Sequence, residues 1–372
     1  MDFSTTDDQR ALVALATQIL GERATPKRLQ QLEDDGTWLD LELWRTLADA
    51  GVVGAALPEE HGGSGLGLIE LVLLLEQVGA HVAQVPLFET VLTAALPIAR
   101  WGTPEQQQRD LPDVAAGTAV LTAALNETGR DDLTRPLTTA VLDGETVRLT
   151  GTKSGVPLLL QARRVLVPAS LVDGRVVLAL LDPTAAGVTS RAQTSTNGQP
   201  QGELELADAV AELLVGPDTG ADALGWLLDR AHVGLAALAL GVSGRALAMS
   251  ATYTTGRVQF GRPIATFQAV GHRLADAYVD VEGMRLTTLQ GAWLLDAELP
   301  GRQEARVAKW WAAEGGHRVA HATQHVHGGM GVDVEYPLSR YFRWSKHLEF
   351  ALGSAQSQLL SIGATLAAEP VL

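Results

Sequence analysis

The chain has 372 residues, 46% of them hydrophobic and 19% charged, and is long enough to bury a large core over two or three domains. The formal net charge of −15 argues against nucleic acid or an anionic membrane as a partner, because both attract a basic surface. The absence of cysteine excludes disulfides, thiolate nucleophiles and thiolate metal sites.

The N-terminal residues predict no export signal. Met1–Ser4 carries neither the basic region nor the apolar stretch of a signal peptide. The longest apolar run, near residues 235–242, is too short to span a bilayer. We therefore expect a cytoplasmic protein with no membrane insertion.

Residues 1–117 predict a helical domain. Apolar residues recur at helical spacing over residues 7–20, and a second amphipathic pattern covers residues 42–50. Residues 68–78 are apolar on almost every face, which is typical of a buried helix. The glycine-rich residues 62–65 lack the lysine and flanking strand of a phosphate-binding loop, so we interpret them as a plain loop.

Residues 118–220 predict an antiparallel β domain. Short segments rich in Val, Leu and Thr are separated by Gly, Pro and Asp, as in an all-β region. The expected strands cover residues 120–124, 139–141, 147–149, 164–167, 176–181 and 203–206.

Residues 221–372 predict a four-helix bundle. The expected helices cover residues 226–253, a second segment that begins at Gln268, residues 303–325 and residues 348–366. The second of these has an apolar seam formed by Val270, Leu274, Ala277, Val281 and Met284, opposite Arg273, Asp276 and Asp280. The fold class is therefore multidomain α+β: a helical domain, a β-barrel-like domain and a helical bundle.

One polar stretch links the first two helices of the bundle: Arg257-x-x-Phe260-Gly261-x-Pro263-Ile264-x-x-Phe267-Gln268. A guanidinium fork suits phosphate, and an aromatic ring with an amide suits a nucleotide base. Composition alone is equally compatible with a plain helix–helix corner.

A second motif narrows the choice. His327-Gly328-Gly329-Met330-Gly331 is followed by Glu335-Tyr336-Pro337. With both motifs in this order, the chain resembles the acyl-CoA dehydrogenase family over essentially its full length. The resemblance implies an N-terminal helical domain, a middle β-barrel-like domain and a C-terminal four-helix bundle, with boundaries near 117 and 220.

The resemblance also implies a reaction. Family members bind FAD and remove hydrogen from the α and β carbons of an acyl-CoA thioester. A glutamate takes the α proton and the flavin takes the β hydride. An electron-transfer flavoprotein or a similar acceptor is the implied partner for reoxidation.

Site residues follow from the same resemblance. Arg257, Phe260 and Gln268 are expected to contact the FAD held mainly by a neighbouring subunit. Gly328 and Gly329 would let the backbone approach the adenosine portion closely. The polar contact beside this glycine pair falls to Gln324 or His325.

A metal site at this end of the chain is a weaker interpretation. His321, His325 and His327 form a histidine cluster, but no carboxylate lies at helical spacing from it. We therefore expect no metal.

Leucine stands where most family members carry the catalytic glutamate. The run Gly353-Ser354-Ala355-Gln356 is preceded by Leu352, and leucine cannot accept a proton. Glu349 and Asp229 are weak substitutes; Glu349 lies one helical turn before Leu352, and Asp229 lies near the alternative base position at Ala231. No catalytic residue is therefore assigned.

The segment expected to face the subunit's own flavin is also altered. Asn126 replaces a hydroxyl residue, and Gly155 and Pro157 replace an aromatic and a hydroxyl residue. The losses fall in the half-site for the chain's own FAD, whereas the residues lent to a neighbour are kept.

This asymmetry favours one hypothesis. The chain would be the base-lacking subunit of a heteromeric α2β2 acyl-CoA dehydrogenase, which acts on steroid side-chain CoA thioesters such as those of cholesterol degradation. The alternatives are a self-sufficient homotetramer with a displaced base, and a flavin-free structural or acyl-CoA-binding homologue.

Overall fold

The computed structural model describes residues 3–368, which divide between two compact units. One unit contains the residues up to Gln31, Val72–Ala83 and the residues from His232 onward. The other contains Leu32–Leu71 and Gln84–Ala231. These limits cross those of the three predicted domains, so the boundaries near 117 and 220 stay a prediction.

The first unit is helical. Its elements, some of which begin or end in the second unit, are α1 (Asp7–Arg23), α2 (Pro26–Asp34), α4 (Leu68–Ala80), α7 (Gly220–Gly256), the hairpin β8 (Val258–Gln259) and β9 (Arg262–Pro263), η3 (Ile264–Thr266), α8 (Gln268–Asp296), α9 (Arg302–His327), η4 (Gly328–Val332), α10 (Leu338–Phe350) and α11 (Ala355–Ala368). Thr6 starts α1 with a capping box, because its hydroxyl accepts from the Gln9 amide and Gln9 accepts from the Thr6 amide.

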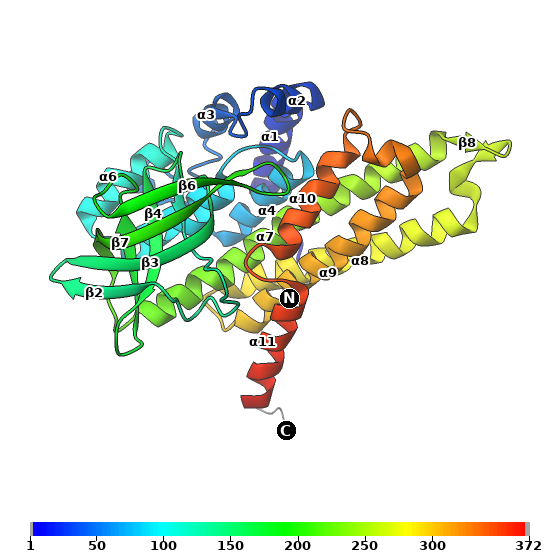
Figure 1. Ribbon diagram of the computed structural model, residues 1–372. Helices are drawn as coiled ribbons and strands as arrows, with labels where there is room; N and C mark the ends of the chain where they lie inside the picture. Colours follow the sequence, from blue (N-terminus) through cyan, green and yellow to red (C-terminus); the bar gives the residue numbers. More distant parts are fainter. Residues whose placement is uncertain (1–2, 369–372) are drawn as a thin grey trace. The chain divides into compact units, whose positions relative to one another are not determined.

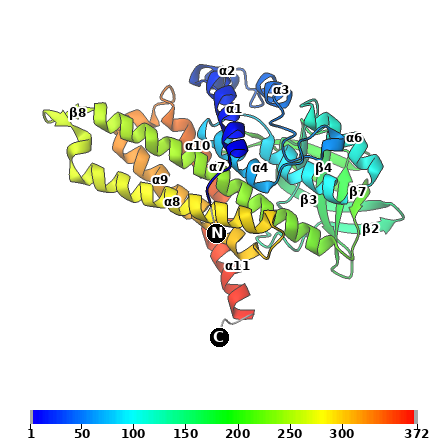
Figure 2. The same cartoon turned by 180° about the vertical axis from the view of Figure 1, so that it is seen from behind.

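The bundle is built on α9. Helices α8, α10 and α11 all pack against α9, and α8 runs beside α7 out to the β8–β9 hairpin (Figures 1 and 2). The single helix predicted over residues 348–366 is wrong, because α10 ends at Phe350 and α11 begins at Ala355. The break lies at Leu352 and Gly353, which both have positive φ.

One residue of α8 departs from the predicted pattern. Asp280 was expected on the face opposite the apolar seam, but it is buried. Its carboxylate pairs with the Arg318 guanidinium of α9 at 2.6 and 2.9 Å. A buried carboxylate needs such a partner, and the sequence spacing on α8 alone does not reveal one.

Helix α7 is long and apolar enough to cross a membrane by length and composition, in contrast to the expectation from its short apolar run. Most of its apolar window is buried inside the fold, as in the core helix of a bundle.

Helices α4 and α7 cross with almost no space between their backbones. A Cβ atom on Gly241 would lie 1.9 Å from the Glu76 carbonyl oxygen, and one on Gly79 would lie 2.1 Å from the Leu238 carbonyl oxygen. The crossing therefore requires glycine on both helices.

The second unit holds a seven-stranded sheet, which confirms the barrel-like β domain. The strands are β1 (Leu121–Ala123), β2 (Thr139–Asp143), β3 (Thr146–Pro157), β4 (Arg164–Ser170), β5 (Val176–Leu181), β6 (Val188–Thr194) and β7 (Pro200–Val215). The order β1-β4-β2-β3-β7-β5, with a further β4–β5 pairing, closes β4, β2, β3, β7 and β5 into a ring.

Two details of the sheet differ from the prediction. The sheet is not wholly antiparallel, because β1 pairs with β4 in parallel through Leu121 and Arg164. Strand β6 was not predicted; its half-exposed sequence lacks an apolar alternation, and it pairs with β7 off the closed ring.

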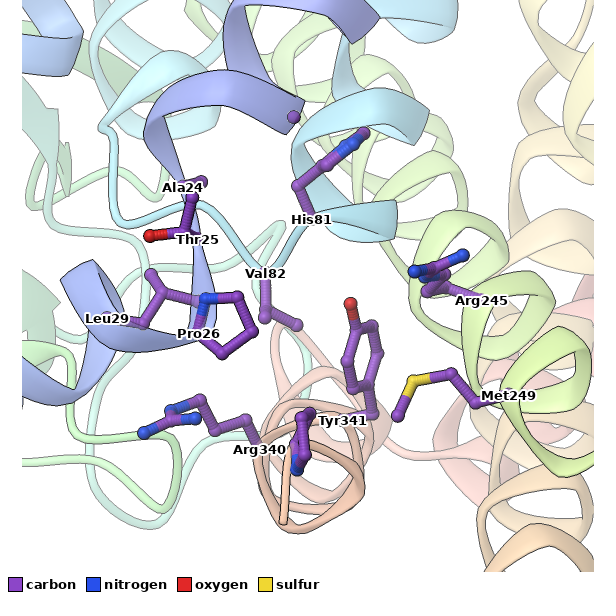
Figure 3. Close-up of a pocket in the computed structure, with 12 residues that line it drawn as sticks. Ala24, Thr25, Pro26, Leu29, His81, Val82, Arg245, Met249, Arg340 and Tyr341 are labelled. Atoms are coloured by element: carbon purple, nitrogen blue, oxygen red, sulfur yellow. The ribbon is translucent and has the colours of Figure 1, made fainter. Parts of the chain in front are cut away.

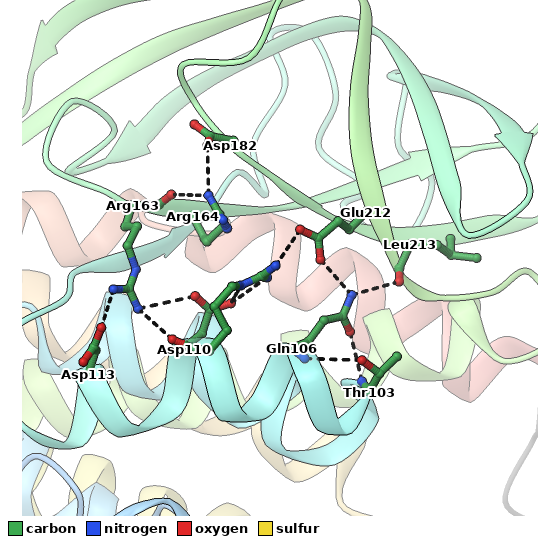
Figure 4. A network of polar contacts seen from close by, with 10 residues as sticks. Thr103, Gln106, Asp110, Asp113, Arg163, Arg164, Asp182, Glu212 and Leu213 are labelled. Carbon is green, nitrogen blue, oxygen red and sulfur yellow. Dashed lines mark hydrogen bonds and ion pairs between the residues drawn. The ribbon is translucent and has the colours of Figure 1, made fainter.

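Short helices complete the second unit: α3 (Leu41–Asp49), η1 (Glu59–His61), the π-helix η2 (Leu87–Ala95), α5 (Leu96–Trp101) and α6 (Pro104–Ala115). A polar network joins α6 to the sheet (Figure 4). Asp110 is fully buried and forms ion pairs with Arg109 and Arg163. Arg109 also pairs with Glu212 of β7 at 2.7 Å.

The α4–α7 crossing supplies a stability test. We expect Gly241→Ala to lower the free energy of unfolding by about 2 kcal/mol or more, because the new methyl group forces the helices apart. The matched control is Gly244→Ala on the same helix, where a Cβ atom meets nothing within 4 Å. This control should stabilise the chain by about 0.5–1 kcal/mol through helix propensity. Equal effects in urea unfolding would contradict the packing argument.

Candidate functional site

The Arg257–Gln268 stretch forms a two-residue β-hairpin rather than a plain corner. Val258 pairs with Pro263 and Gln259 pairs with Arg262. Phe260 and Gly261, at the turn, have φ values of 52° and 77°. Positive φ at both central positions is typical of a type I′ turn, which matches the twist of the flanking strands.

Phe260 is exposed in a strained conformation. Its side chain is 93% exposed, and a left-handed backbone is uncommon for an aromatic residue. Its ring meets Phe267 edge-on at 6.1 Å, and the Arg262 guanidinium lies 4.3 Å from the Phe267 ring centre. The hairpin therefore presents an aromatic ring outward.

The other expected FAD contacts of this stretch are exposed too. Arg257 is exposed at the end of α7, where its amide donates to the Tyr253 carbonyl oxygen. Gln268 is exposed as the first residue of α8. Within this unit, the three side chains are open to a molecule outside the chain.

The second motif forms the turn after α9. Gly328 ends the helix with φ 60°, and its amide donates to the Gln324 and His325 carbonyl oxygens. Gly328 and Gly329 are exposed, and a Cβ atom on either would meet nothing within 4 Å. Their backbone is therefore open to close approach by a ligand.

The structure distinguishes the two candidates for the polar contact beside the glycine pair, Gln324 and His325. A Cβ atom on Gly331 would lie only 2.4 Å from the Gln324 side-chain nitrogen. The Gln324 side chain therefore packs against the glycine run. His325 is exposed on the same helix. The geometry favours Gln324 as the polar group beside the glycine turn.

Aromatic stacking joins the second motif to the end of α7, just before the first motif. The His327 ring stacks on Tyr253 of α7 with 4.3 Å between ring centres. His327 Nδ1–H donates to the Thr323 carbonyl oxygen at 2.8 Å, so Nε2 accepts from the Tyr336 hydroxyl at 3.1 Å. The turn after α9 thus lies at the same end of the bundle as the hairpin.

Sequence reasoning missed Tyr253 and the positioning role of Tyr336. The signal was available for Tyr253, which lies one helical turn before Arg257. His321 instead packs against His317 and Phe342. Among residues 3–368, no group of three His, Cys, Asp or Glu side chains has metal-binding geometry.

Leu352 lies in the break between α10 and α11. Its side chain is buried, and its φ of 50° is uncommon for a branched apolar residue. Its carbonyl oxygen accepts from His232 Nε2 at 3.2 Å and from the Gln358 amide at 3.4 Å.

Lys309 of α9 forms hydrogen bonds around the same break. Its ammonium group is fully buried and donates to the carbonyl oxygens of Leu348, Glu349 and Gly353 at 2.9–3.2 Å. Burial lowers the pKa of Lys309 to about 7, against the opposing charge of Glu349. The amine therefore replaces the missing amide donors beyond the helix C-terminus.

His232 is a neutral neighbour of this break. Burial, reinforced by the charge of Lys309, lowers the pKa of His232 to about 3. Its proton lies on Nε2, which faces the Leu352 carbonyl oxygen, so Nδ1 is the acceptor. Nδ1 has no hydrogen-bond partner within residues 3–368.

The two weak substitutes for the base, Glu349 and Asp229, have different surroundings. The Glu349 carboxylate is held by Lys346 Nζ at 2.6 Å and by His317 Nδ1 at 3.1 Å. Asp229 is buried in α7 and interacts with another group of the chain. The double contact of the Glu349 carboxylate weighs against its action as a free base.

In the second unit, the altered β3 segment is satisfied internally. The Gly155 amide donates to Gln193 Oε1 at 3.0 Å, and the Ser154 amide donates to the Asn126 carbonyl oxygen at 3.0 Å. These amides are not free to bind a flavin ring, and Gly155 and Pro157 carry no hydroxyl group. This half-site therefore does not fit the cofactor that the family resemblance implies.

Glu127 and Lys153, beside that segment, form a buried ion pair of 2.9 Å. Lys153 follows Val147 and Leu149 on the inward face of β3. The Glu127 carboxylate also accepts from the Leu137 and Thr138 amides, and these donors and the lysine charge hold its pKa below the usual value despite burial. The pair links the loop after β1 to β3.

Comparison with known proteins identifies the family. Residues 6–118 match the model of the acyl-CoA dehydrogenase N-terminal domain, and residues 218–367 match that of the C-terminal domain. The chain belongs to the acyl-CoA dehydrogenase family. It is thus an oxidoreductase of the class that acts on acyl-CoA thioesters.

Several known proteins are similar to this chain over its full length or nearly so. Acyl-CoA dehydrogenase FadE27 of Mycobacterium tuberculosis is 42% identical over 100% of both chains. A chain of the ChsE4–ChsE5 complex of the same organism is 42% identical, covers 100% of both chains and has a TM-score of 0.93. A chain of the Tcur3481–Tcur3483 steroid ACAD G363A variant is 45% identical, with a TM-score of 0.92 over 97% of this chain and 98% of that one.

A buried carboxyl group in this acyl-CoA dehydrogenase was not foreseen from the sequence. Glu89 lies in the π-helix η2, is 7% exposed, and accepts from the Gln199 amide at 2.5 Å. Burial raises its pKa to about 7. A lone carboxylate in the apolar run of residues 87–95, together with a π-helix, is the signal that could have found it.

The raised pKa of Glu89 predicts how stability varies with pH. The folded chain holds the Glu89 proton up to about pH 7, whereas the unfolded chain loses it near 4.5. The contribution of Glu89 to stability is therefore full below pH 4.5 and is lost as the pH rises through 7. Glu89→Gln removes this loss, so its stability relative to the unmodified chain should rise by about 3 kcal/mol between roughly pH 4.5 and 8.

Urea unfolding at a series of pH values measures this difference. The control is Glu60→Gln, whose side chain is exposed on the same unit and should show no such trend. A constant offset for Glu89→Gln across the pH range would contradict the buried, protonated carboxyl group.

Proposed function

We propose that this chain is the base-lacking subunit of a heteromeric acyl-CoA dehydrogenase, with α2β2 composition, and that it completes a FAD site whose flavin pocket and base belong to a homologous partner chain. One observation carries the proposal: the exposed Arg257, Phe260 and Gln268 suit a cofactor outside the chain, whereas the Gly155 amide is already bonded within it. The cofactor fits the lent half-site and not the chain's own.

Within that site, each residue has a binding role. The Arg257 guanidinium pairs with a phosphate of the cofactor, because a planar fork matches phosphate oxygens. Phe260 offers a ring face, and the Gln268 amide offers both a donor and an acceptor. The open backbone at Gly328 and Gly329 admits the adenosine portion, with Gln324 beside it. FAD, when bound, supplies the hydride acceptor for the β carbon of the acyl group.

The lack of a base at Leu352 supports the proposal that the partner chain supplies the base. Leu352 occupies the position where the resemblance expects a glutamate, and the Glu349 carboxylate is engaged by Lys346 and His317. Proton abstraction from the α carbon therefore falls to the partner chain. This assignment leaves the present chain with cofactor binding and assembly.

The substrate and setting are proposed from relatives. One similar structure is described as a steroid ACAD and another as a two-component complex. We propose a steroid side-chain CoA thioester, as in cholesterol degradation, as the substrate. We also propose a cytoplasmic location and an electron-transfer flavoprotein or similar acceptor.

Turnover tests the assembly. We expect this chain alone to give no dehydrogenation of a steroid side-chain CoA thioester with an artificial electron acceptor, and the chain co-expressed with a base-containing homologue to be active. Arg257→Met in this chain should weaken FAD retention by the complex about tenfold or more, because a charge-assisted phosphate contact is lost.

The control is Arg135→Met, which removes an exposed arginine of the second unit. Turnover by this chain alone would overturn the proposal, and its loss in Glu349→Gln would then indicate a self-sufficient enzyme with a displaced base. FAD retention unchanged by Arg257→Met would contradict the role of the hairpin.

A further inference from the structure

A cavity of about 250 Å³ lies within the helical unit (Figure 3), and Pro337 is the one motif residue that lines it. Its walls come from the end of α1, the start of α2, the residues after α4, one face of α7 and the start of α10. These elements are distant in the sequence, and nothing in the proposed flavin site uses the cavity.

The walls are mostly apolar. Leu29 and Val82 are buried side chains, and Met249 and the Tyr341 ring face the same space (Figure 3). Apolar surface of this kind favours a hydrocarbon group over water. A cavity of about 150 Å³ accepts benzene, so this one has room for a hydrocarbon body of about six to eight carbons.

The charged groups that line the cavity are both cationic. Arg245 and Arg340 are present, and no aspartate or glutamate lines it, although the whole chain has a formal net charge of −15. Arg340 Nη2 donates to Gln30 Oε1 at 2.6 Å. The cavity therefore has a local charge opposite to that of the protein.

Arg245 is placed by Tyr341. The Tyr341 hydroxyl donates to the Ala80 carbonyl oxygen at 2.9 Å, so its oxygen can accept from the Arg245 guanidinium. The charges of Arg245 and Arg340 both lower the pKa of Tyr341, against the larger effect of burial, which raises it. Arg245 makes no ion pair with a carboxylate within residues 3–368.

We propose that this cavity binds a monocarboxylate with a short hydrocarbon chain. The carboxylate pairs with the Arg245 guanidinium at the open side, and the hydrocarbon chain packs on Leu29, Val82, Met249 and the Tyr341 ring. Inorganic phosphate fits less well, because it leaves the apolar walls in contact with water. An uncharged alcohol of the same length leaves the guanidinium unpaired.

Titration calorimetry on the full chain, with octanoate as the probe, tests this site. We expect saturable binding at one site per chain. Octan-1-ol and inorganic phosphate should each bind at least about tenfold more weakly than octanoate. The alcohol keeps only the apolar contacts, and phosphate keeps only the ion pair with Arg245. Phosphate binding as tight as that of octanoate would overturn the proposal.

Two variants locate the site. Arg245→Met should weaken octanoate binding about tenfold or more and leave octan-1-ol binding unchanged. Met249→Trp fills the cavity and should weaken both ligands while the cationic group is retained. The control is Arg273→Met, an exposed arginine of α8 outside the cavity.

Circular dichroism melts establish that each variant is folded. Octanoate binding that survives both Arg245→Met and Met249→Trp would overturn the proposal, as would an equal loss in Arg273→Met. Both outcomes are independent of whether the chain completes a flavin site, because neither variant alters the hairpin or the glycine turn.

Discussion

The buried ammonium group of Lys309 holds the break between α10 and α11 in place. It donates to three backbone carbonyl oxygens around the break, and His232 donates to the Leu352 carbonyl oxygen. All of these contacts are made to the backbone. These contacts hold the turn through its backbone and do not themselves require a particular side chain at residue 352.

Backbone strain at Phe260 is not offset by side-chain packing within the chain. Phe260 stands in a left-handed conformation that costs about 1 kcal/mol or more for a residue other than glycine. Its ring is nevertheless 93% exposed and gains little from packing within the chain. Strain and exposure together are more easily explained by a contact outside the chain. The molecule thus combines a buried leucine at the α10–α11 break with a strained, outward ring at Phe260.

Much of the fold could be predicted because its signals are periodic and local. The β5 strand at Val176–Leu181 and the start of α8 at Gln268 follow directly from apolar runs and from Gly and Pro. Strand β6 was missed because its stability comes from pairing with β7 rather than from its own pattern. The break at Leu352 was missed because its determinant, Lys309, lies in another helix.

The candidate site shows the same division. Motif residues such as Arg257 and Gly328 could be located from sequence order, since their types and spacing are specific. The hairpin that carries Phe260, the Tyr253–His327 stack and the buried Glu89 could not, because each depends on a tertiary contact or on burial. Tertiary burial also explains why Asp280, expected at the surface, lies inside with Arg318.

The most direct measurement of the central claim is the flavin content of the purified two-chain complex, from absorbance after denaturation against the amount of each chain. A homomeric pair has two equivalent complete sites by symmetry, whereas a heteromeric pair in which one chain lacks its own half-site has a single complete site. The account predicts about one FAD per pair of chains, and none retained by this chain alone. About one FAD per chain, or a flavin-bound preparation of this chain by itself, would contradict it.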